Sequence, residues 1–416
     1  MEQGQEQLAR DLSQPNRMLS SWAVMMRYGR VLLGMWVLLL FTGCTLPQIS
    51  AEERIFLPIT VELLDVVTLP RQTFEDTVVG GLSALTYDRS RDVFYALSDD
   101  RGSFASPRFY TLAMSIADAT AERPQIGSVS VSDVTLLRDA TGEVYERDRL
   151  DTEGIVLSPR QTLFISSEGV ANTKSPPALN EYNLETGRLI TEFRIPDRFL
   201  PSSDPAATEP EVALQGIRSN QGFEALALGP TSSAGDFEPF RLFMATESAL
   251  AQDFDNNPAN PLTSRFLHYL ISPEQSTLIA EHAYPLSLEP TGAVSHGLTE
   301  LVAIDAGGHF LALERAYGIR GFDIKLFQLA TGGATDISTF SRLVSLEGVN
   351  PIRKQPLLDF ATLDTSETSG NVIQNLEGMT LGPGLPNGAI TLWIISDDNF
   401  ADDQTTQIWL FRLQQS

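Results

Sequence analysis

The sequence is poor in cysteine, histidine and basic side chains. Its 416 residues include one cysteine and four histidines, and 29 basic residues stand against 53 acidic ones, which gives a formal net charge of −24. A surface this acidic repels nucleic acid and anionic lipid, because both carry dense negative charge. A single cysteine leaves no partner for an intramolecular disulfide. We therefore expect packing, and any bound metal, to stabilise the fold.

Two common hydrolase motifs are also absent. No G-x-S-x-G elbow occurs, which disfavours an α/β-hydrolase esterase. The histidines show no H-E-x-x-H spacing, which disfavours a zinc site of that type. His268 and His282 are expected to be strand residues, and His309 belongs to no metal-binding pattern. His296 lies just before a recurring motif and could act as a proton donor there.

The N-terminal region resembles a bacterial lipoprotein signal. Arg27 and Arg30 precede the apolar run 31–41, which is too short to span a bilayer comfortably, and Cys44 follows shortly after. The pattern predicts a signal peptide over 1–43 and lipidation of Cys44. A plain signal peptide and an uncleaved anchor are the alternatives.

Lipidation would place the protein in the cell envelope, facing the periplasm or the exterior and held to the membrane by the lipid alone. Without lipidation the protein would be secreted. The region before the apolar run is long, so translation could also begin at Met18, Met25 or Met26. A tether over 44–58 would lead into one folded domain over 59–416.

A short motif occurs five times after the tether. Its copies are "VGGLSALTYD" (79–88), "DTEGIVLSP" (151–159), "NQGFEALALGP" (220–230), "SHGLTELVAID" (295–305) and "QNLEGMTLGP" (374–383). Each copy is followed by a second strand-like run that ends in acid, as in "TLFISSEG" (162–169) and "TLWIISDDN" (391–399). Copies about 70 to 77 residues apart indicate a repeated supersecondary unit.

The repeat predicts an all-β fold. Alternating runs rich in β-branched and aromatic residues fill each unit, and long amphipathic helix patterns are absent after residue 50. Four antiparallel strands per unit around a common axis make a β-propeller. The last unit has only three evident strands, and the unpartnered run 59–69 would supply the fourth. We expect five blades, or six if 196–219 and 347–374 contain further strands.

The recurring acids are predicted to converge around the propeller axis. A motif acid at the start of one strand and a second acid at the end of the next are neighbours in an antiparallel hairpin. In the first unit Ser83 stands in place of the motif acid. The expected metal-binding set is Asp99, Asp100, Glu153, Glu168, Glu224, Glu247, Glu300, Glu314, Glu377, Asp397 and Asp398.

Carboxylates gathered in this way repel one another as water is excluded. Raised pKa values, compensating arginines and bound cations are the three possible outcomes. Arg101 and Arg315 are the obvious nearby bases, which are few, so bound cations are favoured. All-oxygen ligation indicates Ca²⁺ before Mg²⁺. The alternative is structural: each acid accepts backbone N–H bonds from the neighbouring blade.

The motifs in series resemble those of the "esterase-like activity of phytase" family, from about residue 60 to the C-terminus. The sequence departs from the usual repeat at Ala225, where glycine is commoner, and at "LTEL", which also lacks the glycine. The resemblance implies a metal-dependent phosphoesterase whose repeated Glu and Asp residues carry the activity.

Two functions are consistent with these observations. The first is a Ca²⁺-dependent phosphoesterase acting on a small phosphate ester. In it Glu153, Glu224, Glu300 and Glu377 supply ligands and a base, while Arg101 and Arg315 steady the phosphate. Lys174 is a further, weaker phosphate contact. The second is a non-catalytic, calcium-stabilised, lipid-anchored propeller that binds a ligand or a protein partner.

Overall fold

A computed structural model describes residues 55–169, 175–201, 215–230, 238–254, 261–287, 292–343, 345–363 and 373–415. Cys44, the rest of the predicted signal peptide and tether up to residue 54, and Lys174 lie outside these ranges. The helices in the described ranges are the short 3₁₀ segments η2 (Asp197–Phe199), η3 (Ala251–Asp253) and η4 (Phe360–Thr362). Within the same ranges, no helix has the length and apolar character needed to cross a membrane.

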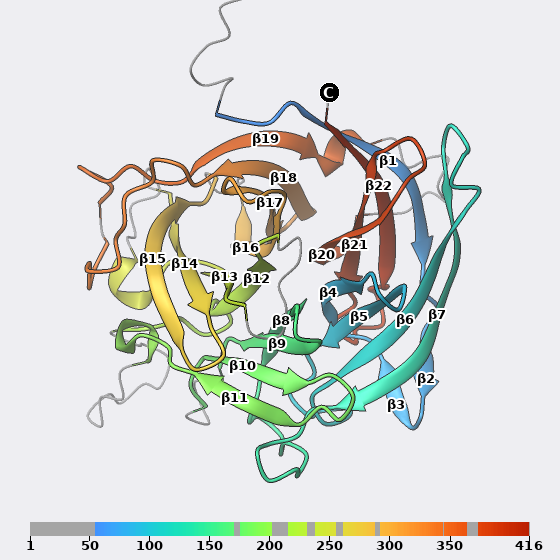
Figure 1. Cartoon of the computed structure of the whole chain (residues 1–416), viewed down its shortest axis with the longest axis horizontal. Coiled ribbons are helices and arrows are strands. Elements are labelled where there is room, and N and C mark those ends of the chain that lie inside the picture. The colour runs from blue at the N-terminus through green and yellow to red at the C-terminus, as the bar shows by residue number, and fades with distance from the viewer. Residues whose placement is uncertain are drawn as a thin grey trace, which may run out of the picture. The chain divides into compact units, whose positions relative to one another are not determined.

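Five four-stranded antiparallel sheets are arranged around a central axis (Figure 1). Blade 1 contains β4 (Leu82–Asp88), β5 (Val93–Ser98), β6 (Arg108–Ala117) and β7 (Gln125–Leu136). Blade 2 contains β8 (Thr152–Leu157), β9 (Thr162–Ser167), β10 (Ala178–Asn183) and β11 (Leu189–Phe193). Blade 3 contains β12 (Phe223–Leu228), β13 (Phe240–Thr246), β14 (Thr263–Ile271) and β15 (Ser276–Pro285).

Blade 4 contains β16 (Ala293–Ala303), β17 (His309–Gly318), β18 (Gly321–Ala330) and β19 (Arg353–Asp359). Blade 5 contains β20 (Asn375–Gly384), β21 (Ile390–Asp397), β22 (Gln407–Gln415) and the N-terminal strand β1 (Ile59–Thr68). A small ribbon of β2 (Gln72–Phe74) and β3 (Thr77–Val79) precedes blade 1.

The innermost strands close a ring, in which β4, β8, β12, β16 and β20 each contact the innermost strand of the next blade. The predicted five-bladed propeller is therefore confirmed. The segment 347–374 does hold a strand, β19, but it is the outer strand of blade 4 and not part of a sixth blade.

The two ends of the described chain meet in blade 5. Strand β1 pairs antiparallel with β22, from Ile59 opposite Gln415 to Thr68 opposite Gln407. The run 59–69 therefore supplies the strand that the last repeat lacks, as predicted. Strand β1 is the outer strand of this sheet, so the first and last strands of the described chain are held together in one blade and the ring is closed.

Burial follows the position of a strand within its blade. The innermost strands have both faces covered, and almost every residue of β4, from Leu82 to Asp88, is buried. Outer strands such as β7 and β15 alternate between covered and open positions, because one face packs on the blade and the other meets solvent. The motif strands accordingly read as short apolar runs, whereas the outer strands alternate.

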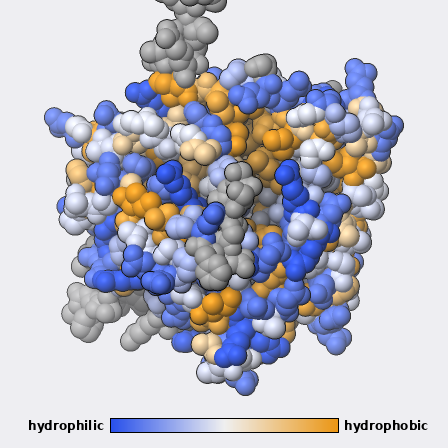
Figure 2. Space-filling view, viewed as in Figure 1, coloured by the Kyte–Doolittle hydropathy of each residue, from blue (hydrophilic) through white to orange (hydrophobic). Residues whose placement is uncertain are grey.

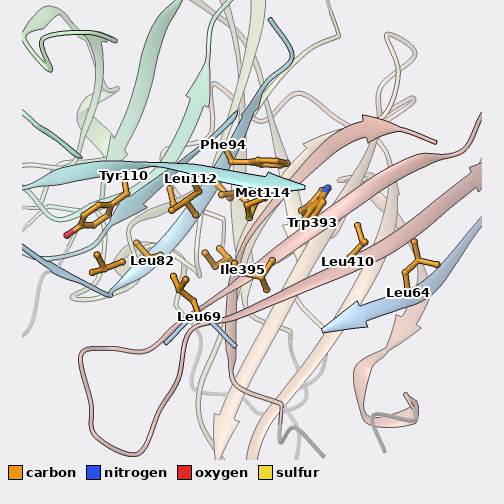
Figure 3. Packing of buried hydrophobic residues seen from close by; sticks show 14 of the residues in the cluster. Leu64, Leu69, Leu82, Phe94, Tyr110, Leu112, Met114, Trp393, Ile395 and Leu410 are labelled. Atoms are coloured by element: carbon orange, nitrogen blue, oxygen red, sulfur yellow. The ribbon is translucent and has the colours of Figure 1, made fainter. Parts of the chain in front are cut away.

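The hydrophobic core lies mainly between adjacent blades. Between blades 1 and 5, Phe94 of β5 packs on Trp393 of β21 with ring centroids 5.2 Å apart, and Leu112 and Ile395 belong to the same cluster (Figure 3). Burying each such side chain contributes about 1.5–3 kcal/mol. Hydrophobic and hydrophilic side chains are interspersed on the face seen in Figure 2.

Candidate functional site

The same irregularity recurs in every innermost strand, near the start of β4, β8, β12 and β20 and in the middle of β16. The pairing with the second strand shifts register between Leu82 and Ala84, Thr152 and Ile155, Phe223 and Leu226, Leu298 and Glu300, and Leu376 and Gly378. A bulge bends its strand and redirects a side chain that regular pairing would leave elsewhere. The motif acids are placed by these bulges.

The register identifies equivalent positions in the five blades. In each blade, one residue of the innermost strand lies opposite one residue of the second strand just before the bulge. From blade 1 to blade 5 these pairs are Leu82 with Ser98, Thr152 with Ser167, Phe223 with Thr246, Leu298 with Glu314, and Leu376 with Ser396. The residues that follow on the innermost strands form the bulge ring: Ser83, Glu153, Glu224, Thr299 and Glu377. The residues that follow on the second strands form the rim ring: Asp99, Glu168, Glu247, Arg315 and Asp397.

Blade 4 departs from the repeat in both rings. Thr299 takes the place of the bulge glutamate, and Arg315 takes the place of the rim acid. Glu300 pairs with Leu313, and Glu314 pairs with Leu298, so the two glutamates are not the hairpin neighbours that the sequence predicts. Glu300 lies one residue after the bulge-ring position, and Glu314 lies one residue before the rim-ring position. A shift of one residue moves a side chain to the other face of a strand.

Asp151 belongs to the site, although the sequence motif does not single it out. It stands two residues before the bulge position, where the other blades have Gly81, Gly222, Gly297 and Asn375. The departure from glycine at this position is the signal that could have found it.

Glycine at this position leaves room for the rim acid of the preceding blade. The Gly222 N–H donates to Glu168 Oε2 over 2.8 Å, and a Cβ on Gly222 would lie 2.4 Å from Glu168 Cβ. A Cβ on Gly297 would lie 2.2 Å from Glu247 Cγ. The glycines therefore allow adjacent blades to approach closely enough for their acids to meet.

The acids around the axis form one electrostatic cluster. Burial first, and neighbouring carboxylates second, raise the pKa of Asp99, Glu153, Glu224 and Asp397 well above the usual range. The pKa of Glu168 is raised well above that range by burial and by Asp151.

Three further carboxyls belong to the cluster, and burial is the main cause that raises the pKa of Asp151, Glu247 and Glu377. Arginines oppose the shift in all three. Asp151, Glu168 and Asp397 are at most 3% exposed, whereas Glu153, Glu224 and Glu377 are 7–9% exposed. The three bulge-ring glutamates are thus slightly more open than these three acids, whereas Asp99 of the rim ring is only partly buried.

Two arginines partly balance this charge. Arg315 Nη2 lies 3.0 Å from Glu247 Oε1, and Arg315 Nη1 binds Glu377 and lies 2.7 Å from Asn375 Oδ1. Burial opposes the charge on Arg315, but the surrounding glutamates raise its pKa. Arg101 Nε donates to Asp151 Oδ1 over 2.8 Å. Both arginines are therefore occupied by carboxylates of the cluster.

Blade 2 brings three carboxylates closest together. Asp151, Glu153 and Glu168 each offer an oxygen such that the three atoms lie within 4.8 Å of one another. Asp151 Oδ2 is buried and has no hydrogen-bond partner in the described part of the chain. An unpaired buried carboxylate oxygen is costly unless a cation or a proton satisfies it. A donor set of oxygens alone fits a hard divalent cation.

Four of the predicted metal ligands are instead engaged with protein groups. Asp100 accepts hydrogen bonds from Arg108 Nη1 at 2.8 Å and from the N–H groups of Ser103 and Ala105. Asp398 Oδ1 accepts from the N–H of Gly81 at 2.8 Å. These contacts are those of structural acids that tie loops and blades together.

The other two predicted metal ligands that protein groups engage are Glu314 and Glu300. Glu314 accepts from Tyr284 Oη and binds Lys354, and His296 Nε2 lies 3.5 Å away, so hydrogen bonds and charge hold its pKa at about 2 against the effect of burial. Glu300 Oε1 accepts the N–H groups of Leu301 at 2.9 Å and Leu226 at 3.2 Å. Burial raises the pKa of Glu300 well above the usual range.

The architecture defines a five-bladed β-propeller with an acidic cluster at one end of its axis. The chain belongs to the Phytase-like family, described as "esterase-like activity of phytase", whose profile matches residues 77–400. That family description indicates a hydrolase. A search of curated proteins gave no match.

Several solved structures show a distant likeness. The endo-arabinase from Bacteroides thetaiotaomicron VPI-5482 is 9% identical, with 84% of this chain and 96% of that chain covered and a TM-score of 0.42. The catalytic domain of Coprinopsis cinerea GH62 alpha-L-arabinofuranosidase is 10% identical, with 86% and 98% covered and a TM-score of 0.39. Likenesses this weak carry no argument about activity.

Proposed function

We propose that the protein is a calcium-dependent phosphoesterase whose ion is held by blade 2. The observation that carries this proposal is the trio Asp151, Glu153 and Glu168, with oxygens within 4.8 Å of one another and one buried oxygen unpartnered. Each carboxylate offers one ligand oxygen, and Ca²⁺, with its flexible coordination, accepts such an irregular set of oxygens more readily than Mg²⁺, which requires a strict octahedron.

When bound, Ca²⁺ would polarise a phosphoryl oxygen and lower the pKa of a bound water. Glu224 is the neighbouring carboxyl in the bulge ring, and its pKa is raised by burial and by Glu247 and Glu168. A carboxyl with a raised pKa holds a proton more strongly than an ordinary carboxyl, so Glu224 would serve as general acid or base. Arg101 and Arg315 keep the surrounding carboxylates oriented, and would offset charge when a phosphate ester arrives.

The test combines binding and turnover on protein stripped of metal with a chelator. We expect Ca²⁺ to bind by calorimetry and to switch on hydrolysis of p-nitrophenyl phosphate or bis-p-nitrophenyl phosphate. Asp151→Asn should weaken Ca²⁺ binding and slow hydrolysis at least tenfold. Asp402→Asn, which changes an exposed carboxylate paired only with Arg71, is the matched control and should leave both unchanged.

Two results of the same experiment would contradict the proposal. Calcium binding that raises the melting temperature without any hydrolysis would favour the non-catalytic, calcium-stabilised propeller. Absence of calcium binding would overturn both functions. The near-complete burial of Asp151 and Glu168 makes the first of these outcomes the principal rival.

We propose as well that Cys44 carries a lipid that anchors the protein in the cell envelope, facing the periplasm or the exterior. Support comes from the sequence around the cysteine alone. Labelled fatty acid should be incorporated into the wild-type protein and not into Cys44→Ser, which should appear in the soluble fraction. Equal labelling of the two would overturn the assignment.

A further inference from the structure

An aromatic pair lies next to the acidic cluster. Phe104 and Phe400 are stacked, with ring centroids 4.3 Å apart and planes 19° from parallel. Phe104 is 54% exposed, although a phenylalanine ring normally gains from burial. Phe104 follows β5 and Phe400 follows β21, the strands that lead into Asp99 and Asp397 of the rim ring.

The backbone around this pair is built to hold it. Phe400 has a φ of +51°, and its N–H donates to Asp398 Oδ1 over 3.1 Å. A Cβ on Gly81 would lie 2.4 Å from Phe400 Cε2 and 2.3 Å from Asp99 Oδ1, so one glycine makes room for both the ring and the acid. The Phe104 N–H donates to Asp100.

A left-handed conformation at phenylalanine costs of order 1–3 kcal/mol and persists only where the surroundings impose it. Asn399 shares this conformation, with a φ of +48°, and the Ala401 N–H closes the turn by donating to the Asp398 carbonyl over 2.7 Å, so the turn fixes the position of the Phe400 ring. The loop that carries Phe104 begins at Arg101, which contacts Asp151 of the proposed calcium site. The exposed ring and the proposed ion are therefore linked through one short loop.

The charge of the site limits which phosphate esters can bind. Its eight carboxylates lie at positions 99, 151, 153, 168, 224, 247, 377 and 397. They outnumber the nearby arginines, of which Arg101 and Arg315 are already paired and Arg218 acts on Glu247. The lysines in the described ranges are also engaged, Lys354 with Glu314 and Lys325 with Asp323. A densely phosphorylated molecule such as inositol hexakisphosphate would meet repulsion that one calcium ion does not cancel.

From these observations we infer that the substrate carries a single phosphate linked to a planar aromatic ring, and that Phe104 stacks on that ring. The inference rests on the proposed phosphoesterase function. Stacking would provide the affinity that the acidic site cannot supply through phosphate contacts. Aryl esters and nucleotides share this chemistry.

The test measures binding by calorimetry to the full calcium-loaded protein, so that affinity is read independently of turnover. The probes are phenylphosphonate, methylphosphonate, adenosine monophosphate and inositol hexakisphosphate. We expect phenylphosphonate to bind about tenfold more tightly than methylphosphonate. Phe104→Leu, which keeps an apolar side chain and removes the ring, should abolish that advantage and leave methylphosphonate binding unchanged.

The matched control is Phe340→Leu, which changes another partly exposed phenylalanine outside the site and should have no effect. A nucleotide source is indicated if adenosine monophosphate shows the same dependence on Phe104, and an aryl source if only phenylphosphonate does. Equal affinity for phenyl and methyl probes, or tightest binding of inositol hexakisphosphate, would overturn the inference.

The two proposals fail separately. Calcium-dependent hydrolysis of p-nitrophenyl phosphate without ring selectivity would retain the phosphoesterase and remove the aromatic subsite. Ring-selective binding with no hydrolysis would retain the subsite as a ligand site and remove the enzyme.

Discussion

Arg315 and Glu247 occupy the same strand position in neighbouring blades and form an ion pair, with Nη2 3.0 Å from Oε1. Arg315 thus replaces the acid that the other four blades carry in the rim ring. It also binds Glu377 of the bulge ring. The arginine at this position of the repeat therefore supplies the positive charge that balances Glu247 and Glu377.

Arg315→Gln is expected to lower the free energy of unfolding of the metal-free protein by about 3–5 kcal/mol, because it leaves Glu247 and Glu377 buried without their countercharge. The measurement is urea unfolding at pH 7. Arg71→Gln, which removes an exposed ion pair with Asp402, should change stability by less than about 1 kcal/mol. An equally small loss in Arg315→Gln would show that protonation already neutralises the two glutamates.

The pH dependence of stability should depend on whether calcium is bound. The pKa values of Glu153, Glu168, Glu224 and Asp397 are raised in the folded protein, so the folded state binds more protons than the unfolded state above about pH 4. The contribution of these four groups to stability should therefore be greatest below that pH and fall as pH rises through their raised pKa values, whereas carboxyls with lowered pKa values, such as Glu314, lose their contribution only at lower pH.

Calcium should reverse this loss at neutral pH and release protons as it binds. Thermal melts between pH 4 and 8, with chelator or with calcium, measure the first effect. Calorimetric titrations in buffers of different ionisation enthalpy measure the second. A melting temperature that rises with pH in chelator would contradict the raised pKa values.

Much of the fold could be predicted because a repeated motif constrains both strand order and blade number. The run 59–69 had no partner in the first repeat, and the last repeat lacked one strand. These two features predicted that β1 would complete the last blade and close the ring. The site was less predictable. Alignment by recurring glutamates places Glu300 with Glu153, whereas the bulge places Thr299 there. Backbone register decides which face a side chain takes, and it is fixed by packing between blades, which a single sequence does not display. Asp151 was missed for another reason, because the motif was aligned on its glutamates and not on the glycine position that Asp151 occupies.

Glu153→Gln and Glu300→Gln test this register directly. Both residues are motif glutamates, but only Glu153 belongs to the trio with Asp151 and Glu168. Glu153→Gln should weaken calcium binding at least tenfold. Glu300→Gln should leave it within about twofold, because the amide oxygen can still accept the N–H groups of Leu226 and Leu301. Equal losses by calorimetry would place Glu300 at the ion after all.

Gly297→Ala should disturb the ion pair of Arg315 and Glu247 although neither of these residues is replaced. The new Cβ would lie 2.2 Å from Glu247 Cγ, which forces Glu247 to move and costs about 1–3 kcal/mol in unfolding free energy. Gly332→Ala is the matched control, because no heavy atom lies within 4 Å of its Cβ. Its stability should stay close to that of the wild type.

A double-mutant cycle gives the decisive measurement. In a Glu247→Ala background the clashing Cγ is absent, so Gly297→Ala should cost little more than the control, and the two substitutions should be strongly non-additive in urea unfolding. Additive losses would mean that Gly297 is needed for its backbone and not for the space it leaves. The glycine of the motif would then have a different role from the one that its contact with Glu247 indicates.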